Sequence, residues 1–123
     1  MILVDTSVWV DHLQHRNERL VERLGQAQIL GHPLVIGELA LGGLKQKSRV
    51  LMALQGLPAS MAATDAEVLA FIDRQKLSGT GIGYVDAHLL VACRLTPGTL
   101  LWTLDKRLNA AAHGLGLAFA PAH

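Results

Sequence analysis

The chain has 123 residues, of which half are hydrophobic, and its charges nearly balance to a formal net charge of +1. That length predicts one domain spanning residues 1–123, with enough apolar side chains to form a core. The small net charge excludes a general electrostatic attraction to nucleic acid, so any contact with RNA would need a local basic patch. No run of about 20 apolar residues is present, which predicts that no segment spans a membrane.

The chain has one cysteine, Cys93, which excludes an internal disulfide and fits the reducing cytoplasm, where we expect the protein to act. Cys93 lies in the apolar run LLVACRL, so we interpret it as a core residue rather than a nucleophile. The N-terminal segment MILVDTSVWV has no basic start, and Asp5 interrupts its apolar run too early for a signal peptide.

Short apolar segments alternate with helical patterns along the chain. In the first half we predict strands at 2–4 and 28–30 and helices at 8–13, 18–24, 34–44 and 48–55. In the second half we predict helices at 65–77, 84–95 and 105–112, a glycine loop at 79–83, and strands at 99–104 and 117–119. Because the strands are short and lack polar alternation, the pattern predicts an α/β sandwich with a central parallel sheet flanked by helices.

Four acidic residues occupy unusual positions in this pattern. Asp5 and Asp105 each follow a predicted strand, and the ends of parallel strands open on one edge of a sheet. Glu38 and Asp86 lie in the apolar helical segments VIGELAL and YVDAHLL, where a carboxylate is costly to bury unless it is paired or binds a metal. A hard cation such as Mg²⁺ or Mn²⁺ would relieve the repulsion among converging carboxylates.

Each acid also has a simpler interpretation. Asp5, Asp86 and Asp105 all stand where a helix begins and are suitable capping residues, and Glu38 could be a solvated helix residue. The pattern alone leaves both interpretations open.

Four segments of the sequence, taken together and in order, resemble a known family. These are DTSVW, HPLVIGELALG, GYVDAHLLVA and LLWTLDKRL, and they resemble PIN-domain proteins, most closely the VapC-type toxins of bacterial toxin–antitoxin pairs. The resemblance covers essentially the whole chain. It implies a PIN-like three-layer sandwich and an acidic pocket in which Asp5, Glu38, Asp86 and Asp105 are the catalytic and metal-binding residues.

The resemblance also implies supporting residues. Thr6 matches a polar residue beside the first acid, and Thr103 matches a threonine two positions before the fourth, where its hydroxyl could orient that carboxylate or a metal-bound water. Asn109, one turn after Asp105, is expected to help through a hydrogen bond. Some PIN domains carry a further acid one turn after the third, whereas this chain has Leu89 and Leu90. We therefore expect one tightly bound metal ion rather than two, and the sequence does not decide between a one-metal and a two-metal mechanism.

The function implied is that of a Mg²⁺-dependent endoribonuclease, with Mn²⁺ as a substitute, acting as a toxin that a cognate antitoxin inhibits. A homodimer is also implied, and the helix of Val8, Trp9 and Leu13 and the segment 39–44 are candidate surfaces for these partners. We expect the antitoxin to insert an Arg- or Lys-bearing segment into the acidic pocket. Candidate contacts to RNA phosphates are the basic residues Lys45, Lys47, Arg49, Lys106 and Arg107.

Other functions fit the sequence less well. A haloacid-dehalogenase-like phosphatase would need a second acid where this chain has Ser7, and a phospho-receiver domain would need adjacent acids and a late lysine. His12 and His15 lack a recognisable third zinc ligand, so we interpret them as surface residues. A PIN-type nuclease acting on DNA, or a non-catalytic RNA-binding PIN-like domain, stays open, and the sequence does not identify the RNA.

Overall fold

The computed structural model describes residues 1–121 and has a parallel sheet at its centre. The sheet contains β1 (Ile2–Val4), β2 (Ile29–Leu30) and β3 (Leu100–Trp102), in the order β2-β1-β3. Ile2 lies opposite Ile29 on one side and opposite Leu100 on the other. All three β1 residues are buried, as expected for a strand that has neighbours on both edges and helices on both faces.

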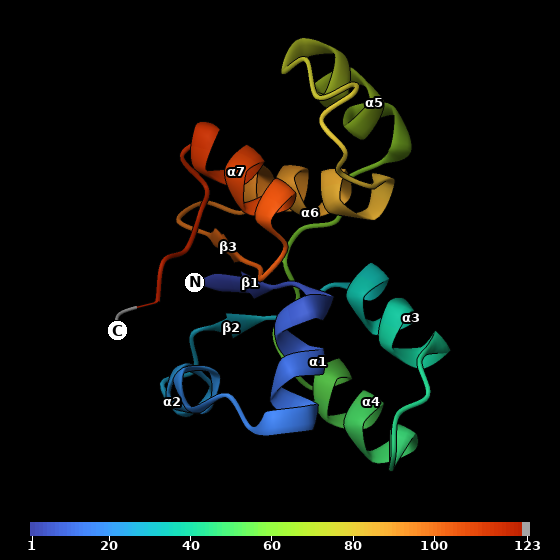
Figure 1. Cartoon of the computed structure of the whole chain (residues 1–123), viewed down its shortest axis with the longest axis vertical. Coiled ribbons are helices and arrows are strands. Elements are labelled where there is room, and N and C mark those ends of the chain that lie inside the picture. Colours follow the sequence, from blue (N-terminus) through green and yellow to red (C-terminus); the bar gives the residue numbers. More distant parts are fainter. Residues whose placement is uncertain (122–123) are drawn as a thin grey trace.

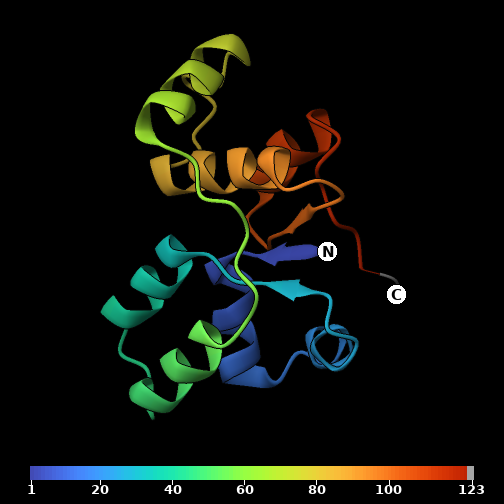
Figure 2. The same ribbon diagram turned by 180° about the vertical axis from the view of Figure 1, so that it is seen from behind.

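Helices flank this sheet on two sides. In Figures 1 and 2, helices from the first half of the chain gather below the strands and helices from the second half lie above them. The first group contains α1 (Thr6–His15), α2 (Glu18–Gly25), α3 (Pro33–Leu41) and α4 (Lys47–Gln55). The second group contains α5 (Asp65–Arg74), α6 (Tyr84–Leu95) and α7 (Lys106–Gly114). The predicted α/β sandwich is therefore confirmed; of the predicted domain 1–123, residues 122–123 lie outside the described part.

Side chains that precede the helices fix where several of them begin. Asp5 accepts a hydrogen bond from the backbone N–H of Ser7 at the start of α1, and Asp105 accepts one from the N–H of Leu108 at the start of α7. At α5, Thr64 and Glu67 form a reciprocal capping box. Asp86 likewise accepts the backbone N–H of Gly83 at the start of α6. Three of the four acids singled out from the sequence thus bond backbone N–H groups where helices begin, so the simpler interpretation holds for them without excluding a second role.

Several predicted boundaries were wrong. The helix predicted at 34–44 ends at Leu41, because Gly42 is extended (φ −76°, ψ 162°), and the helix predicted to run to residue 77 ends at Arg74. The strand predicted at 99–104 is limited to β3, and the edge strand predicted at 117–119 is reduced to one bridge between Leu101 and Ala118.

Helix α6 passes through the core of the domain. Its residues from Ala87 to Cys93 are all buried, so this helix contacts neighbouring elements on every side. Burial raises the pKa of the Cys93 thiol to about 12, which keeps the thiol protonated near neutral pH and agrees with its interpretation as a core residue. Within residues 1–121, no helix is both long and apolar enough to cross a membrane.

Candidate metal centre

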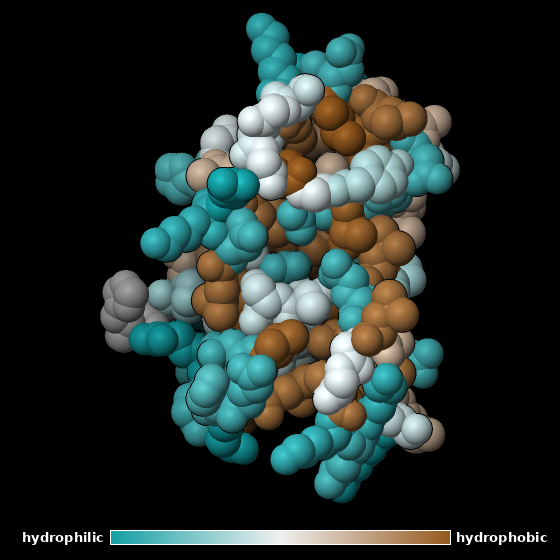
Figure 3. All heavy atoms as spheres, turned by 45° about the vertical axis from the view of Figure 1, so that its right-hand side comes forward, coloured by the Kyte–Doolittle hydropathy of each residue, from teal (hydrophilic) through white to brown (hydrophobic). Residues whose placement is uncertain are grey.

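The four acidic residues come together at the carboxyl edge of the sheet. Asp5 follows β1 and Asp105 lies just beyond β3, while Glu38 is on α3 and Asp86 is in the first turn of α6. The negative charges of the other three carboxylates all act on the Asp86 carboxyl group, which places each of them within electrostatic range of Asp86. Figure 3, which turns this edge toward the viewer, shows hydrophilic residues in a recess bordered by hydrophobic ones.

Asp5 is the most tightly held of the four. Only 5% of its surface is exposed, and its Oδ2 atom accepts hydrogen bonds from the hydroxyls of Ser7 (2.6 Å) and Thr103 (2.8 Å). The Ser7 hydroxyl in turn accepts a bond from the backbone N–H of Leu104 (3.0 Å). These bonds join the end of β1 to the end of β3 and fix the orientation of the Asp5 carboxylate.

Thr103 also positions the main chain of the fourth acid. Its hydroxyl accepts a hydrogen bond from the backbone N–H of Asp105 (3.0 Å) while it donates to Asp5. From the sequence we expected this hydroxyl to orient the Asp105 carboxylate or a metal-bound water. In the structure it bonds the Asp5 carboxylate instead, because β3 ends at Trp102 and the chain turns toward α7, where Asp105 Oδ1 caps the helix (2.9 Å to Leu108 N).

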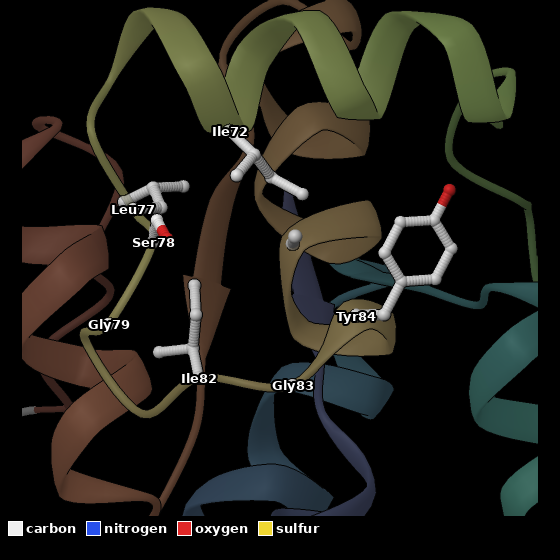
Figure 4. A pocket seen from close by; sticks show the side chains of 8 residues that line it. Ile72, Leu77, Ser78, Gly79, Ile82, Gly83 and Tyr84 are labelled. Carbon is white, nitrogen blue, oxygen red and sulfur yellow. The ribbon is translucent and has the colours of Figure 1, made fainter.

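The two helix-borne acids each have one local anchor. Glu38 is exposed, and its Oε1 atom accepts a hydrogen bond from the hydroxyl of Thr6 (2.6 Å). Oδ2 of Asp86 accepts one from the backbone N–H of Gly83 (2.9 Å), at the end of the loop shown in Figure 4. The predicted supporting residue Thr6 therefore touches an acid, although it is the second acid and not the first.

The pKa of the Asp86 carboxyl group reflects the negative charge of the site. Its pKa is raised first by burial and then by the negative charges of Asp5, Asp105 and Glu38, while the hydrogen bond from Gly83 opposes the rise. None of the four carboxylates has a Lys, Arg or His nitrogen within 4.0 Å among residues 1–121. The site therefore carries negative charge that the described part of the chain does not neutralise at close range.

The chemistry of the donor set fits a hard divalent cation. In each acid one oxygen takes part in the anchoring bonds described above, which leaves the other available as a ligand. As the side chains lie, no group of three or more Asp, Glu, His or Cys residues within 1–121 is close enough to hold an ion by itself. Mg²⁺ commonly takes only one or two protein carboxylates and keeps several waters, so direct ligation by all four is not required.

The remaining sequence predictions are placed but not tested. Asn109 is exposed, and its side chain makes no hydrogen bond within the described residues. The basic residues Lys45, Lys47, Arg49, Lys106 and Arg107 are all exposed, the first group near the start of α4 and the second at the start of α7. The metal roles of the four acids also stay predictions.

The candidate partner surfaces need correction. Val8, Trp9 and Leu39 are at most 5% exposed and belong to the core. Within those segments, Leu13 and Leu41 are the exposed large apolar residues, at 40% and 92%. The apolar periodicity of α1 and α3 therefore arises mainly from packing inside the domain.

Sequence reasoning missed two features. Ser7 was considered only as a capping residue, whereas its hydroxyl donates a hydrogen bond to Asp5 and accepts one from the backbone N–H of Leu104. The second feature lies on the far side of α6 from the acids, where the Tyr84 hydroxyl donates to Asp65 (2.6 Å) and Nε2 of His88 lies 3.0 Å from the same oxygen. Local sequence gives no signal for either arrangement, because both depend on contacts between distant segments.

Comparison with known proteins agrees with this architecture. A family model described as PIN domain matches residues 2–114, and the chain therefore belongs to the PIN-domain family. The solved structure of FitAcB from Neisseria gonorrhoeae has a TM-score of 0.61 and 23% sequence identity, covering 92% of this chain and 94% of that one. At that identity, the likeness supports the fold alone.

Within the family, the chain is of the VapC type. It is 51% identical over 120 residues to proteins named Ribonuclease VapC32 from two strains of Mycobacterium tuberculosis, covering 98% of this chain and 97% of theirs. The resemblance drawn from four sequence segments is thereby confirmed over nearly the full length.

Proposed function

We propose that this protein is a Mg²⁺-dependent endoribonuclease that acts in the cytoplasm as the toxin of a toxin–antitoxin pair. The observation that carries the proposal is the convergence of four carboxylates at one sheet edge without a basic nitrogen within 4.0 Å in residues 1–121. The 51% identity to proteins named Ribonuclease VapC32 supports RNA as the substrate.

The residues have distinct tasks in this proposal. A divalent cation, Mg²⁺ or Mn²⁺, supplies a more acidic water and polarises a phosphoryl oxygen when it is bound. Asp5 would be the best-oriented ligand, since Ser7 and Thr103 hold one of its oxygens. Asp86 would be a second ligand, and Glu38 and Asp105 would accept hydrogen bonds from water or complete the ligand set.

The same unneutralised charge supports the proposed mode of inhibition. An Arg or Lys side chain from a cognate antitoxin would satisfy the carboxylates that the chain leaves without a cation. Exposed Leu41, at the end of α3, is the apolar residue nearest in sequence to Glu38 that such a partner would cover. Replacing the antitoxin's C-terminal basic residues by Ala should weaken inhibition of cleavage, whereas unchanged inhibition across the series would contradict this mode.

We also propose a homodimer, which sedimentation of the purified protein would test.

The test of the activity is digestion of RNA and DNA of matched sequence. We expect the wild-type protein to cleave single-stranded RNA with Mg²⁺ or Mn²⁺, to be inactive with EDTA, and to leave the DNA intact. Cleavage of DNA instead would favour a PIN-type DNA nuclease, and binding of RNA without cleavage would favour a non-catalytic domain.

A separate measurement tests the metal without relying on activity. Metal-free protein should gain thermal stability on addition of Mg²⁺, by about 2.7 kcal/mol at a metal concentration 100 times the dissociation constant. The Asp73→Asn variant removes an exposed acid on α5 and should respond like the wild type. A melting temperature that responds to Mg²⁺ no more than to an equal ionic strength of Na⁺ would contradict the metal site.

A further inference from the structure

Arg107 lies against the backbone of the glycine loop that leads into α6. A Cβ atom placed on Gly81 would come within 2.7 Å of Nη1 of Arg107 and 2.9 Å of its Cδ. Gly81 has φ +87°, a conformation that favours glycine, so the loop both requires this residue and leaves room for the arginine. The Arg107 side chain therefore lies against the loop, where a side chain at residue 81 would collide with it.

Arg107 has no acidic partner there. It follows Asp105 by two positions, yet no carboxylate within residues 1–121 lies within 4.0 Å of its guanidinium. Its side chain is directed toward the glycine loop rather than into the acidic recess. An arginine that no carboxylate neutralises is suited to bind an anion.

A second basic residue lies on the other side of the same hollow. Lys76 and Arg107 both line a cavity of about 490 Å³ between the end of α5 and helix α7. Thr80 and Ala111 are among the other residues that line it, and none of the lining residues is acidic. The cavity is therefore positive in character, in contrast to the neighbouring acidic recess.

The glycine loop connects the two sites. In Figure 4 the loop passes from Gly79, beside α7, to Gly83, at the start of α6. Gly83 donates its backbone N–H to Asp86, so one short segment contacts both Arg107 and a proposed metal ligand. Gly81, which lies against Arg107, is two residues from Gly83, so the cavity and the acids border the same short loop.

We propose that Lys76 and Arg107 form a subsite that binds a backbone phosphate of the RNA next to the one that is cleaved. This proposal rests on the proposed ribonuclease function and adds to it the direction in which the strand leaves the acidic centre. The proposal distinguishes Arg107 from Lys106, because Arg107 lines the cavity and Lys106 is not among its lining residues.

The test measures binding of a fluorescein-labelled 12-nucleotide oligouridylate to the Asp5→Asn variant, which suppresses cleavage, over a range of salt concentrations. Each phosphate contact on a single strand contributes about 0.7 to the slope of log K against log salt. Adding Arg107→Ala or Lys76→Ala should each lower the slope by about 0.7, which corresponds to about a five-fold loss of affinity at 0.1 M salt relative to a 1 M reference. Arg107→Lys should retain most of the slope, because the charge is kept.

Arg94→Ala is the matched control. It removes one positive charge from the exposed last turn of α6, far along that helix from Asp86, and should leave the slope unchanged. In the cleaving protein, Arg107→Ala should raise KM more than it lowers kcat, because the subsite does not touch the reacting atoms. If the wild type cleaves RNA while Arg107→Ala and Lys76→Ala behave like Arg94→Ala, the subsite is disproved. Absence of both binding and cleavage by the wild type would overturn the proposed function itself.

Discussion

Asp5, which follows the central strand, and Glu38, which lies on a helix, are held in different ways. Asp5, at the end of β1, is buried and receives bonds from two hydroxyls that reach it from α1 and from the segment after β3. Glu38, on α3, is exposed and receives one bond from Thr6. The central strand therefore supplies a carboxylate of fixed orientation, and the helix supplies one that can adjust.

This difference has a physical origin in the sheet. β1 is paired on both edges, so the backbone at Asp5 has little freedom to move. A Mg²⁺ ion demands near-octahedral geometry, which a combination of one fixed ligand and adjustable ones can provide around retained waters. Under the proposed function, damage to the fixed acid should therefore cost more than damage to the adjustable one.

Replacement of the fixed acid is expected to have the largest effect. Asp5→Asn should lower cleavage more than about 100-fold, because even residues that only orient metal ligands contribute 10–100-fold. The fold should persist, since Asn is also a good capping residue for α1. Cleavage assays and circular dichroism would check both statements, with Asp73→Asn as the control. An Asp5→Asn variant with wild-type cleavage would contradict the assignment.

Removing the Thr103 hydroxyl, which bonds Asp5, and the Thr6 hydroxyl, which bonds Glu38, compares the two acids directly. Thr103→Val should lower cleavage by about 10–100-fold, because it frees a buried carboxylate, whereas Thr6→Val should cost less, because Glu38 can find water as a partner. Thr103→Ser should restore most of the loss. Equal effects of the two valine variants would show that both acids are held alike.

Low pH should lower the stability of the fold through His32, which precedes α3. This buried residue caps α3 by accepting the N–H of Leu34, and its pKa is lowered to about 4, first by burial and then by the charge of His88. Because the folded-state pKa lies below the usual 6.5, stability is lost as pH falls from about 6.5 toward 4, by at most about 3 kcal/mol.

Unfolding by urea at several pH values would measure this loss. His32→Asn should keep the cap, since Asn can accept the same N–H, but should lose less stability across that pH range. Parallel pH profiles for the two proteins would exclude His32 as the cause.

The smallest expected effect concerns Asp86 in the metal-free protein. Its pKa is raised in the folded state, so its destabilising contribution is absent at low pH and develops as pH rises from the ordinary value of 3.8 through the folded-state pKa. Asp86→Asn should therefore raise the melting temperature slightly at neutral pH in EDTA, and it should reduce the response to Mg²⁺. A melting temperature that falls in EDTA would indicate that the carboxylate stabilises the fold instead.

The positions of the four acids could be predicted because each is marked locally. Asp5 and Asp105 follow apolar strands, and Glu38 lies in an apolar helix, where an acid stands out. The hydrogen bonds among them were not predictable, because they depend on where β3 ends. A strand one residue longer would have turned Thr103 differently, and the sequence does not fix such an end to one residue.

Other contacts have no signal in the local sequence. Ser7 follows Asp5 and Thr6, three good capping residues in a row, so the sequence does not indicate that Asp5 and Ser7 are the two that contact Thr103. The contact of His88 with Asp65 likewise depends on how α5 packs on α6. The glycines at 79–83 were predicted as a loop, but the contact between this loop and Arg107 depends on where α7 packs.

The pairing of the first strand with the last affects how the protein is made. Asp5 and the Thr103 hydroxyl that orients it are 98 positions apart, so a ribosome adding about 5–20 residues per second needs about 5–20 seconds to synthesise the intervening chain. β1 cannot gain its β3 partner, and the acids cannot assemble, until nearly the whole polypeptide exists. The acidic site is therefore incomplete for most of synthesis, and under the proposed function a cognate antitoxin would have that interval before it must act.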